Sequence, residues 1–315
     1  MKTISVVTPC YNEEDNIHEC VNAIRKTFAD LPQYQYEHIF IDNASTDKSL
    51  DILRDIASQD RRIKIIANSR NFGHIRSPYY GLLQANGDAV VLFVADLQDP
   101  SSLIPEFIKK WEEGYKTVVG TKRSSEESSV MFSIRKLYYK TVNRLSNISL
   151  IDNFTGFGLY DREVIEHLRK IDDPYPYFRG LVAEIGLKVF QIPYDQPIRV
   201  RGITKNNFFT LYDIGMLGII SHSQVPLRVA TMAGFLLSFV SIFIAAIYFF
   251  LKLIFWNSFS LGMAPIVIGI FFFASVQLFF VGILGEYLGS IHLYSKRRPL
   301  VIEQERINFP SENNN

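Results

Sequence analysis

The chain has 315 residues, of which 48% are hydrophobic and 14% aromatic, and its formal net charge is +1. This balance of charge argues against a nucleic acid as a partner. The two cysteines, Cys10 and Cys20, form neither a disulfide framework nor a metal-binding spacing, which is typical of a reducing compartment. No basic segment followed by an apolar one begins the chain, so we expect no secretory signal.

Short apolar runs alternate with helical patterns over the first two-thirds of the chain. We expect strands at residues 4–8, 38–41, 63–66, 89–95, 117–120 and 187–192, and helices at 17–28, 50–56, 79–85 and 135–150. Continuous apolar runs indicate strands buried on both faces, and apolar residues at helical spacing indicate the helices. Strands and helices in alternation predict a mostly parallel sheet with helices on both faces. Residues 122–130 are rich in Ser and Glu and predict a mobile loop.

The composition changes sharply near residue 226. Residues 229–251 and 263–283 contain no charged side chain, and about 20 such residues suffice to cross a hydrocarbon core. Basic residues lie outside both spans, at Arg228 and at 296–298. The positive-inside rule therefore predicts a membrane hairpin with both ends in the cytoplasm.

Two further segments flank this hairpin. Residues 206–225 are interpreted either as an amphipathic helix at the membrane surface or as a buried helix of a soluble domain. Residues 306–315 are polar and are expected to be disordered. Small residues such as Gly234, Gly269 and Gly282 would allow the helices to pack closely in a homo-oligomer.

Polar side chains follow three of the predicted parallel strands. Asp96 and Gln98 come directly after the run 89–95, and ligands of open α/β sheets bind beyond the carboxyl ends of the strands. Carboxylate and amide oxygens suit Mg²⁺ or Mn²⁺ holding a diphosphate. The alternative is a strand followed by a helix start, with Asp99 as the N-cap and Pro100 as the first helical residue.

The other two strand ends suggest a nucleotide. Asp42 ends the second strand, where a carboxylate can accept hydrogen bonds from a base or ribose. A polar loop with Pro9, Tyr11, Asn12 and Glu13 follows the first strand. Glycine-rich dinucleotide and P-loop fingerprints are absent from the sequence, which argues against NAD and against a P-loop enzyme.

Several ordered motifs together resemble the family 2 glycosyltransferases of the GT-A fold. They are residues 6–14 (VVTPCYNEE), 42–47 (DNASTD), 69–73 (SRNFG) and 95–100 (ADLQDP). The nearest type is the polyprenyl-phosphate glycosyltransferases, similar to dolichyl-phosphate mannose synthase and to bacterial enzymes that act on undecaprenyl phosphate. The resemblance covers nearly the whole chain, because it continues in residues 202–205 (GITK) and 285–289 (GEYLG).

The resemblance implies a role for each candidate residue. Residues of the first two strand ends would bind the nucleotide: Pro9, Tyr11, Asn12, Glu13 and Asp42. Asp96 and Gln98 would bind Mg²⁺ or Mn²⁺ and the diphosphate of the donor. Arg123, Arg199 and Lys205 would hold phosphates of the donor or the lipid, since Arg forks match phosphate oxygens. The alternative for each of these three cations is a solvated surface charge.

The resemblance also implies an architecture and a reaction. Residues 1–205 would form a Rossmann-like GT-A domain, 206–225 a juxtamembrane segment, 226–290 a transmembrane hairpin, and 291–315 a cytoplasmic tail. The enzyme would transfer a sugar from a nucleotide-sugar, with a UDP-linked donor favoured, to a polyprenyl phosphate at the inner leaflet of the plasma membrane. The displacement at the anomeric carbon would be metal-assisted and inverting.

Two positions depart from the family pattern. Val94 stands where the family has the first Asp of Asp-x-Asp, so Asp96 and Gln98 would hold the metal with help from Asp99. Gly156, in residues 155–159 (TGFGL), stands where the family often has a carboxylate proposed as a base, and Asp152 is near but not aligned. A phosphate acceptor has its second pKa at about 6, so we expect that the acceptor needs no base.

Two alternatives stay open. One is a glycosyltransferase with a different acceptor, although the Gln-x-x-Arg-Trp motif of processive synthases is absent around Trp111 and Trp256. The other is a catalytically degraded, nucleotide-binding membrane scaffold, for which Val94 and Gly156 are the support.

Overall fold

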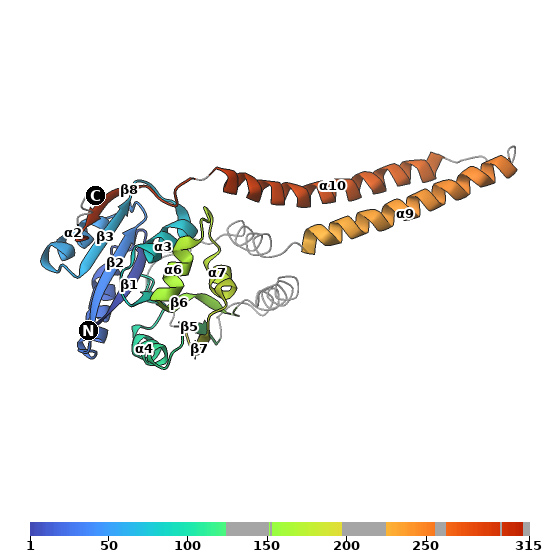
Figure 1. Ribbon diagram of the computed structural model, residues 1–315. Helices are drawn as coiled ribbons and strands as arrows, with labels where there is room; N and C mark the ends of the chain where they lie inside the picture. Colours follow the sequence, from blue (N-terminus) through green and yellow to red (C-terminus); the bar gives the residue numbers. More distant parts are fainter. Residues whose placement is uncertain (124–150, 152, 197–224, 256–262, 297, 311–315) are drawn as a thin grey trace.

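The computed structural model describes residues 1–123, 151, 153–196, 225–255, 263–296 and 298–310. An α/β domain and two long helices are its main parts (Figure 1). In chain order the elements are β1 (Lys2–Cys10), α1 (Ile17–Ala29), β2 (Tyr34–Asp42), α2 (Ser49–Gln59), β3 (Ile63–Asn68), α3 (Gly73–Gln84), β4 (Ala89–Leu92), η1 (Ser101–Leu103), α4 (Ile104–Glu112), β5 (Thr117–Lys122), β6 (Phe154–Asp161), α6 (Arg162–Lys170), α7 (Phe178–Ile185), β7 (Val189–Tyr194), α9 (Val225–Ile254), α10 (Met263–Ser295) and β8 (Glu303–Ile307).

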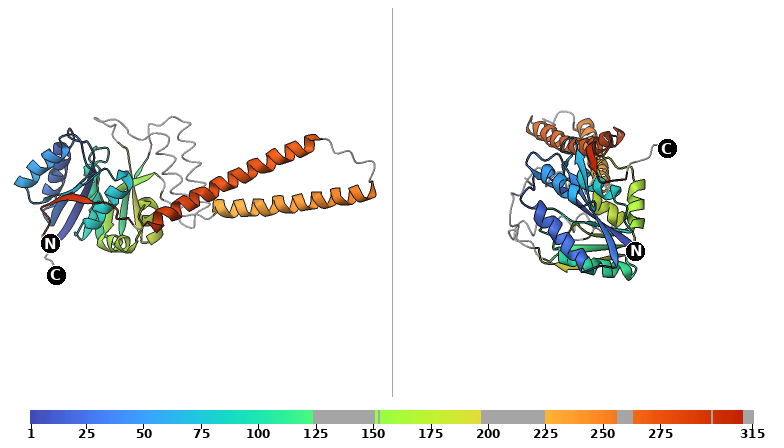
Figure 2. Two further views of the ribbon diagram at one scale, coloured as in Figure 1. Left: turned by 90° about the horizontal axis from the view of Figure 1, so that it is seen from above. Right: turned by 90° about the vertical axis from the view of Figure 1, so that its left-hand side faces the viewer.

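One eight-stranded sheet organises the domain, in the order β7-β5-β6-β4-β1-β2-β3-β8. The strands β1 to β4 are mutually parallel where they pair, and β7 runs parallel to β5. The antiparallel members are β6, between β4 and β5, and β8, beside β3. The predicted mostly parallel, Rossmann-like GT-A fold is therefore confirmed, with helices on both faces of the sheet (Figure 2).

Buried side chains form one hydrophobic cluster on each face of the sheet. Val6 belongs to the cluster that contains Ile24 of α1 and Phe107 of α4. The next residue, Val7, belongs to the opposite cluster with Leu82 of α3. Successive residues of a strand point to opposite faces, so a strand covered on both sides needs apolar residues at every position. This is why the central strands read as uninterrupted apolar runs.

Two predicted boundaries near the site are wrong. Strand pairing of β4 stops at Leu92, although the apolar run continues. Phe93 and Ala95 are buried beyond the paired residues, and Ala95 lies in a turn. The helix after Pro100 begins at Ile104 behind a short 3-10 turn, and Pro100 rather than Asp99 is the residue that precedes this turn. Apolar character reports burial, and it does not by itself report strand pairing.

The helix predicted at 79–85 begins earlier, at Gly73, and contains Pro78. Proline is disfavoured inside a helix because it lacks the N–H group. For this reason the start of the helix was predicted after Pro78. Burial of Tyr79 and Leu82 against the sheet supplies the packing that outweighs this preference.

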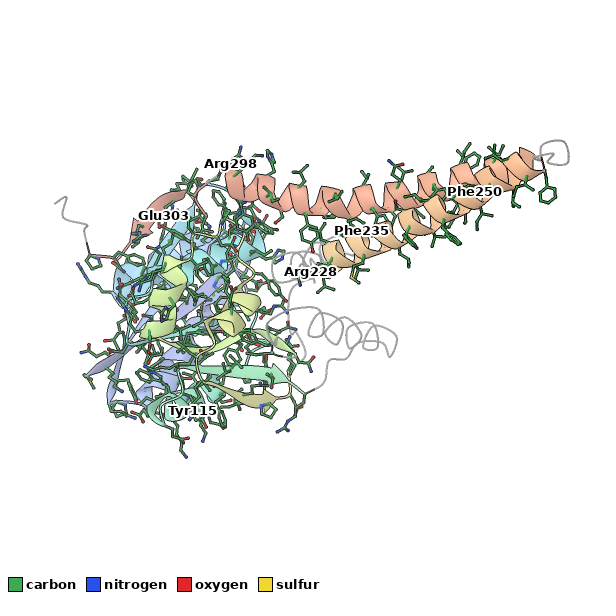
Figure 3. The ribbon with its side chains drawn as sticks, turned by 45° about the vertical axis from the view of Figure 1, so that its right-hand side comes forward. Tyr115, Arg228, Phe235, Phe250, Arg298 and Glu303 are labelled. Atoms are coloured by element: carbon green, nitrogen blue, oxygen red, sulfur yellow. The ribbon has the colours of Figure 1, made fainter. Side chains whose placement is uncertain are left out.

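The predicted membrane spans fall inside α9 and α10. The segments Val225–Ile244 and Gly269–Ser295 are long and apolar enough to cross a membrane, with mean hydropathies of 2.0 and 1.8. None of either hydrophobic window is buried in the chain's own fold. Figure 3 shows α9 and α10 projecting away from the domain, and Phe235 and Phe250 of α9 expose 74% and 60% of their surface.

The chain returns from α10 to the sheet and adds β8 to the outer edge of β3 (Figure 1). Two side-chain contacts hold the strand there: Arg54 Nη2 lies 2.6 Å from Glu305 Oε2, and Tyr80 donates to Glu303 Oε1 at 2.8 Å. Asn308 Nδ2 donates to the carbonyl oxygens of Ala57 and Ile63 at 2.8 and 2.9 Å.

The prediction that the tail is disordered from residue 306 is therefore wrong for its first residues. Exposed and half-buried positions alternate along β8. An edge strand of this kind can be built almost entirely from polar residues, so composition does not reveal it.

Several predictions fall outside the described residues. They are the helix at 135–150, most of the loop at 122–130, the juxtamembrane segment at 206–224, and the side chains of Asp152, Arg199, Lys205 and Trp256.

Candidate active site

The strand register brings three predicted loops to one edge of the sheet. Cys10 of β1 lies opposite Asp42 of β2, and Val7 of β1 lies opposite Leu92 of β4. The polar segments that follow β1, β2 and β4 therefore start side by side. This edge holds the carboxyl ends of the parallel strands, where ligands of such sheets bind.

The loop after β1 is joined to the loop after β2 by hydrogen bonds. The N–H of Asn12 donates to Ser45 Oγ at 3.0 Å, and the N–H of Thr46 donates to Asn12 Oδ1 at 2.8 Å. Glu13 donates its N–H to Ser49 Oγ at 2.9 Å. Asn12 has φ 57°, a left-handed conformation that Asn tolerates better than most residues. Asn12 and Glu13 thus fix the first loop against the second, while Pro9 and Tyr11 are half-buried beside them.

Asp42 is fully buried. Its Oδ1 accepts a hydrogen bond from Ser45 Oγ at 2.5 Å, its Oδ2 accepts one from the Ser45 N–H at 3.1 Å, and the Cys10 thiol lies 3.7 Å from Oδ1. Burial, and secondarily the Asp42 charge, raises the pKa of the Cys10 thiol. A nucleotide contact by Asp42 stays a prediction.

The loop after β4 carries the two predicted metal ligands. Asp96 and Gln98 are half-buried, and the N–H of Gln98 donates to Asp96 Oδ1 at 3.2 Å. Leu97 between them has φ 58°. Asp99 is 6% exposed, and its Oδ1 accepts a hydrogen bond from the Tyr194 hydroxyl at 2.6 Å. Burial raises the pKa of the Asp99 carboxyl to about 6.

This donor set fits a metal only in part. Asp99 is buried and bound to Tyr194 of β7, so help from Asp99 in holding the metal stays a prediction. Within the part of the chain that the structure describes, no group of three or more His, Cys, Asp or Glu is arranged to hold a metal ion. Mg²⁺ sites are, however, often built from one or two protein oxygens together with substrate phosphates. Asp96 and Gln98 fit that kind of shared site.

Changing Val94 to Asp is expected to lower the Mn²⁺ concentration that half-saturates binding of a nucleoside diphosphate about tenfold, because a second carboxylate near Asp96 adds a charged ligand. Val94 is half-buried, so the new side chain has access to solvent. Calorimetric titration with Mn²⁺ measures the effect. Val94→Asn, which has the same shape without the charge, is the control, and equal Mn²⁺ dependence of the two variants would contradict the prediction.

Arg123 stands at the end of β5 beside the end of β7. Its N–H donates to the Tyr194 carbonyl at 3.0 Å, and its Nη1 lies 3.6 Å from Asp195 Oδ2. The side chains of Arg123 and Asp195 are 60% and 72% exposed, and an exposed pair of this kind contributes little to stability. The guanidinium can therefore exchange this partner for a phosphate.

Gly156 lies in β6 next to the end of β4. Its φ is 112°, and a Cβ added to it would lie 3.2 Å from Leu92 Cδ2. Its carbonyl accepts a hydrogen bond from the Tyr160 hydroxyl at 2.5 Å. Glycine adopts such a φ at little steric cost, and other residues do not. The backbone at position 156 thus has a conformation that favours glycine, the residue that stands here in place of the carboxylate of the family pattern.

Hydrogen bonds of the Asn43 side-chain amide link the motif at 69–73 to the loop after β2. Asn43 Nδ2 donates to Asn71 Oδ1 at 2.9 Å, and Asn43 Oδ1 accepts from the Phe72 N–H at 2.9 Å and from Asn68 Nδ2 at 3.2 Å. His74 follows in α3, where burial, and secondarily the charge of Arg179, lowers its pKa. Sequence reasoning missed this network and Tyr194. The network could have been suspected from Asn43, a polar residue directly after a predicted strand end. No local sequence pattern marks Tyr194 as a site residue.

Comparisons with known proteins identify the family of the chain. Residues 5–169 match the family model described as "Glycosyl transferase family 2". An uncharacterized glycosyltransferase of Synechocystis sp. is 36% identical over 300 residues, covering 95% of this chain and 94% of the relative. A protein of Shigella phage SfV named bactoprenol glucosyl transferase is 33% identical over 306 residues, covering 96% of this chain and 99% of the relative.

Among solved structures, the mannosyltransferase PcManGT from Pyrobaculum calidifontis, in complex with GDP-Man and Mn²⁺, matches with a TM-score of 0.48 and 15% identity. The match covers 93% of this chain and 86% of that one. The match to the family model spans more than half of the sequence, and the relatives match it almost from end to end. The chain belongs to glycosyl transferase family 2.

Proposed function

We propose that the protein transfers a sugar from a nucleotide-sugar, UDP-linked in our interpretation, to undecaprenyl or another polyprenyl phosphate at the inner leaflet of the plasma membrane. The name of the phage relative, bactoprenol glucosyl transferase, supports the acceptor class, since the match covers 99% of that protein. The sequence motifs at the carboxyl edge of the sheet support the nucleotide-sugar.

One observation carries the lipid acceptor: the chain leaves and re-enters the sheet at the edge that holds the site. The parallel strand β7 ends at Tyr194 on that edge, before the segment that leads to α9. The antiparallel strand β8 begins at Glu303, opposite Asn68 at the carboxyl end of β3. Tyr294, near the end of α10, donates to Asp173 Oδ2 of the domain at 3.1 Å. This arrangement supports the proposal that, with α9 and α10 in the membrane, the site faces the bilayer.

Each group of site residues has a separate role in the proposed reaction. Asp96 and Gln98 would hold Mg²⁺ or Mn²⁺, which neutralises charge on the leaving diphosphate when bound. Arg123, with Arg199 and Lys205, would hold phosphate groups. The acceptor phosphate, with a second pKa of about 6, is mostly ionised at neutral pH. Its oxygen forms the bond to the anomeric carbon as the bond to the diphosphate breaks, and the configuration inverts. No side-chain base is needed, which agrees with Gly156.

The test uses the full chain in lipid nanodiscs with undecaprenyl phosphate and either Mn²⁺ or Mg²⁺. Radiolabelled UDP-glucose, UDP-N-acetylglucosamine, UDP-galactose and GDP-mannose are offered separately, and the lipid product is identified by mass. We expect one donor to give a lipid-linked monosaccharide, and undecaprenol without its phosphate to give none. Nucleotide binding without any lipid product would favour the scaffold suggested by Val94 and Gly156. Sugar transfer to another acceptor alone would overturn the lipid assignment.

A further inference from the structure

A buried carboxylate and a buried phenol meet directly beside the predicted metal ligands. Asp99 and Tyr194 are 6% and 4% exposed, and the Tyr194 hydroxyl donates to Asp99 Oδ1 at 2.6 Å. Asp99 follows β4 and Tyr194 ends β7, and β6 and β5 lie between these two strands in the sheet. The hydrogen bond therefore connects the loop of residues 93–99, which we call the metal loop, to β7, the outermost strand on that side of the sheet.

The metal loop has a conformation that needs support. Leu97, between Asp96 and Gln98, has φ 58°, a left-handed conformation that is sterically unfavourable for a non-glycine residue. Such residues persist where their surroundings fix them. At the start of the loop, the Phe93 N–H donates to the Val7 carbonyl at 2.9 Å. At its end, Asp99 is held by Tyr194, so both predicted ligands lie between two anchored residues.

Tyr194 itself is rigidly placed. Its ring packs edge-to-face on Phe157 with the ring centroids 5.7 Å apart. Gly120 leaves room for the ring, because a Cβ at that position would lie 2.9 Å from Tyr194 Cε1. The Tyr194 carbonyl accepts the Arg123 N–H at 3.0 Å. One residue therefore contacts the metal loop through its hydroxyl and the predicted phosphate-binding Arg123 through its backbone.

We propose that Tyr194 is a positioning residue for the donor diphosphate. Through Asp99 it holds Asp96 and Gln98 in the geometry that binds the metal, and through its carbonyl it keeps Arg123 on the same side of the site. This inference rests on the proposed metal role of Asp96 and Gln98. It extends that role to a residue that touches neither the metal nor the substrate.

Tyr194→Phe tests the proposal because it removes only the hydroxyl. Groups hydrogen-bonded directly to metal ligands contribute about 10- to 100-fold to metal affinity. Tyr194 acts one residue further away, through Asp99, so we expect the Mn²⁺ concentration that half-saturates UDP binding to rise by the lower figure, about tenfold. UDP binding without Mn²⁺ stays unchanged. Calorimetric titration of the full chain with Mn²⁺ and UDP measures both quantities, and a thermal melt reports stability.

The matched control is Tyr34→Phe. Tyr34 is 7% exposed and donates to Glu112 Oε1, so it is another buried phenol–carboxylate pair. It is the first residue of β2, so it lies at the amino ends of the parallel strands, whereas the site lies at their carboxyl ends. We expect this variant to lose thermal stability with unchanged Mn²⁺ dependence.

The outcomes separate the inference from the function. If Asp96→Ala abolishes Mn²⁺-dependent UDP binding while Tyr194→Phe titrates like the wild type, the positioning role is overturned and the proposed metal role stands. If Tyr194→Phe only melts earlier, as Tyr34→Phe does, the contact is merely structural and the proposal fails. If the wild type itself binds UDP independently of Mn²⁺, both the metal role and the positioning role are overturned.

Discussion

Replacement of Asp96 by alanine is expected to lower the rate of sugar transfer about a hundredfold to a thousandfold, the usual cost of removing one electrostatic stabiliser from an active site. Its neighbours explain why the effect is large. Position 94 is a valine, and the Asp99 carboxylate is buried against Tyr194. Asp96 is left as the carboxylate of this loop that can face a donor diphosphate.

The measurement is the initial rate of lipid-linked sugar formation at saturating donor and metal. Asp96→Asn keeps the shape and the hydrogen-bond acceptor for the Gln98 N–H, and it should also lose most activity if charge is what matters. Asp55→Ala, at an exposed position of α2, is the surface control. Undiminished transfer by Asp96→Ala would mean that this loop does not hold the metal.

Gly156→Asp, which restores the carboxylate of the family pattern, is expected to destabilise the protein instead of supplying a base. A side chain at an unfavourable φ costs about 1–3 kcal/mol, and the contact with Leu92 Cδ2 at 3.2 Å adds overpacking of about 1–3 kcal/mol. We therefore expect the free energy of unfolding to fall by about 2–6 kcal/mol, and the transfer rate per folded molecule not to increase.

Chemical denaturation of the wild type and the variant measures this loss. Gly114→Asp is the matched control, because Gly114 has φ 97° and nothing lies within 4 Å of its added Cβ. It should show the backbone strain without the contact with a neighbour. A Gly156→Asp protein that is as stable as the wild type and transfers sugar faster would mean that a base is useful and that β6 can accommodate it.

The parts of the fold that sequence could predict are those where burial dictates residue type. β1, β2 and β3 are covered on both faces, so their apolar runs mark them. β8 could not be predicted, because an edge strand with one exposed face is built from residues such as Glu303 and Arg306 that also suit a disordered tail. The end of β4 was misplaced because Phe93 and Ala95 stay buried after pairing has ceased.

At the site, residue type indicated the chemistry but not the direction of each side chain. Asp42 ends its strand as predicted, yet its buried carboxylate is hydrogen-bonded to Ser45. Asp99 was expected to help bind the metal, and it faces a tyrosine 95 positions away along the chain. Contacts of such long sequence separation arise from the strand order, which no local pattern encodes.

The pairing of β8 with β3 has a consequence for how the protein is made. Synthesis proceeds from the N-terminus, and domains generally fold in that order. The outer edge of β3, however, stays unpaired until both long apolar helices have been synthesised, and an open strand edge invites wrong pairing. If α9 and α10 cross a membrane as proposed, β8 can reach β3 only when the number of crossings is even. A chain inserted with a single crossing would leave β8 on the other side of the membrane, so pairing of β8 with β3 would then indicate correct insertion.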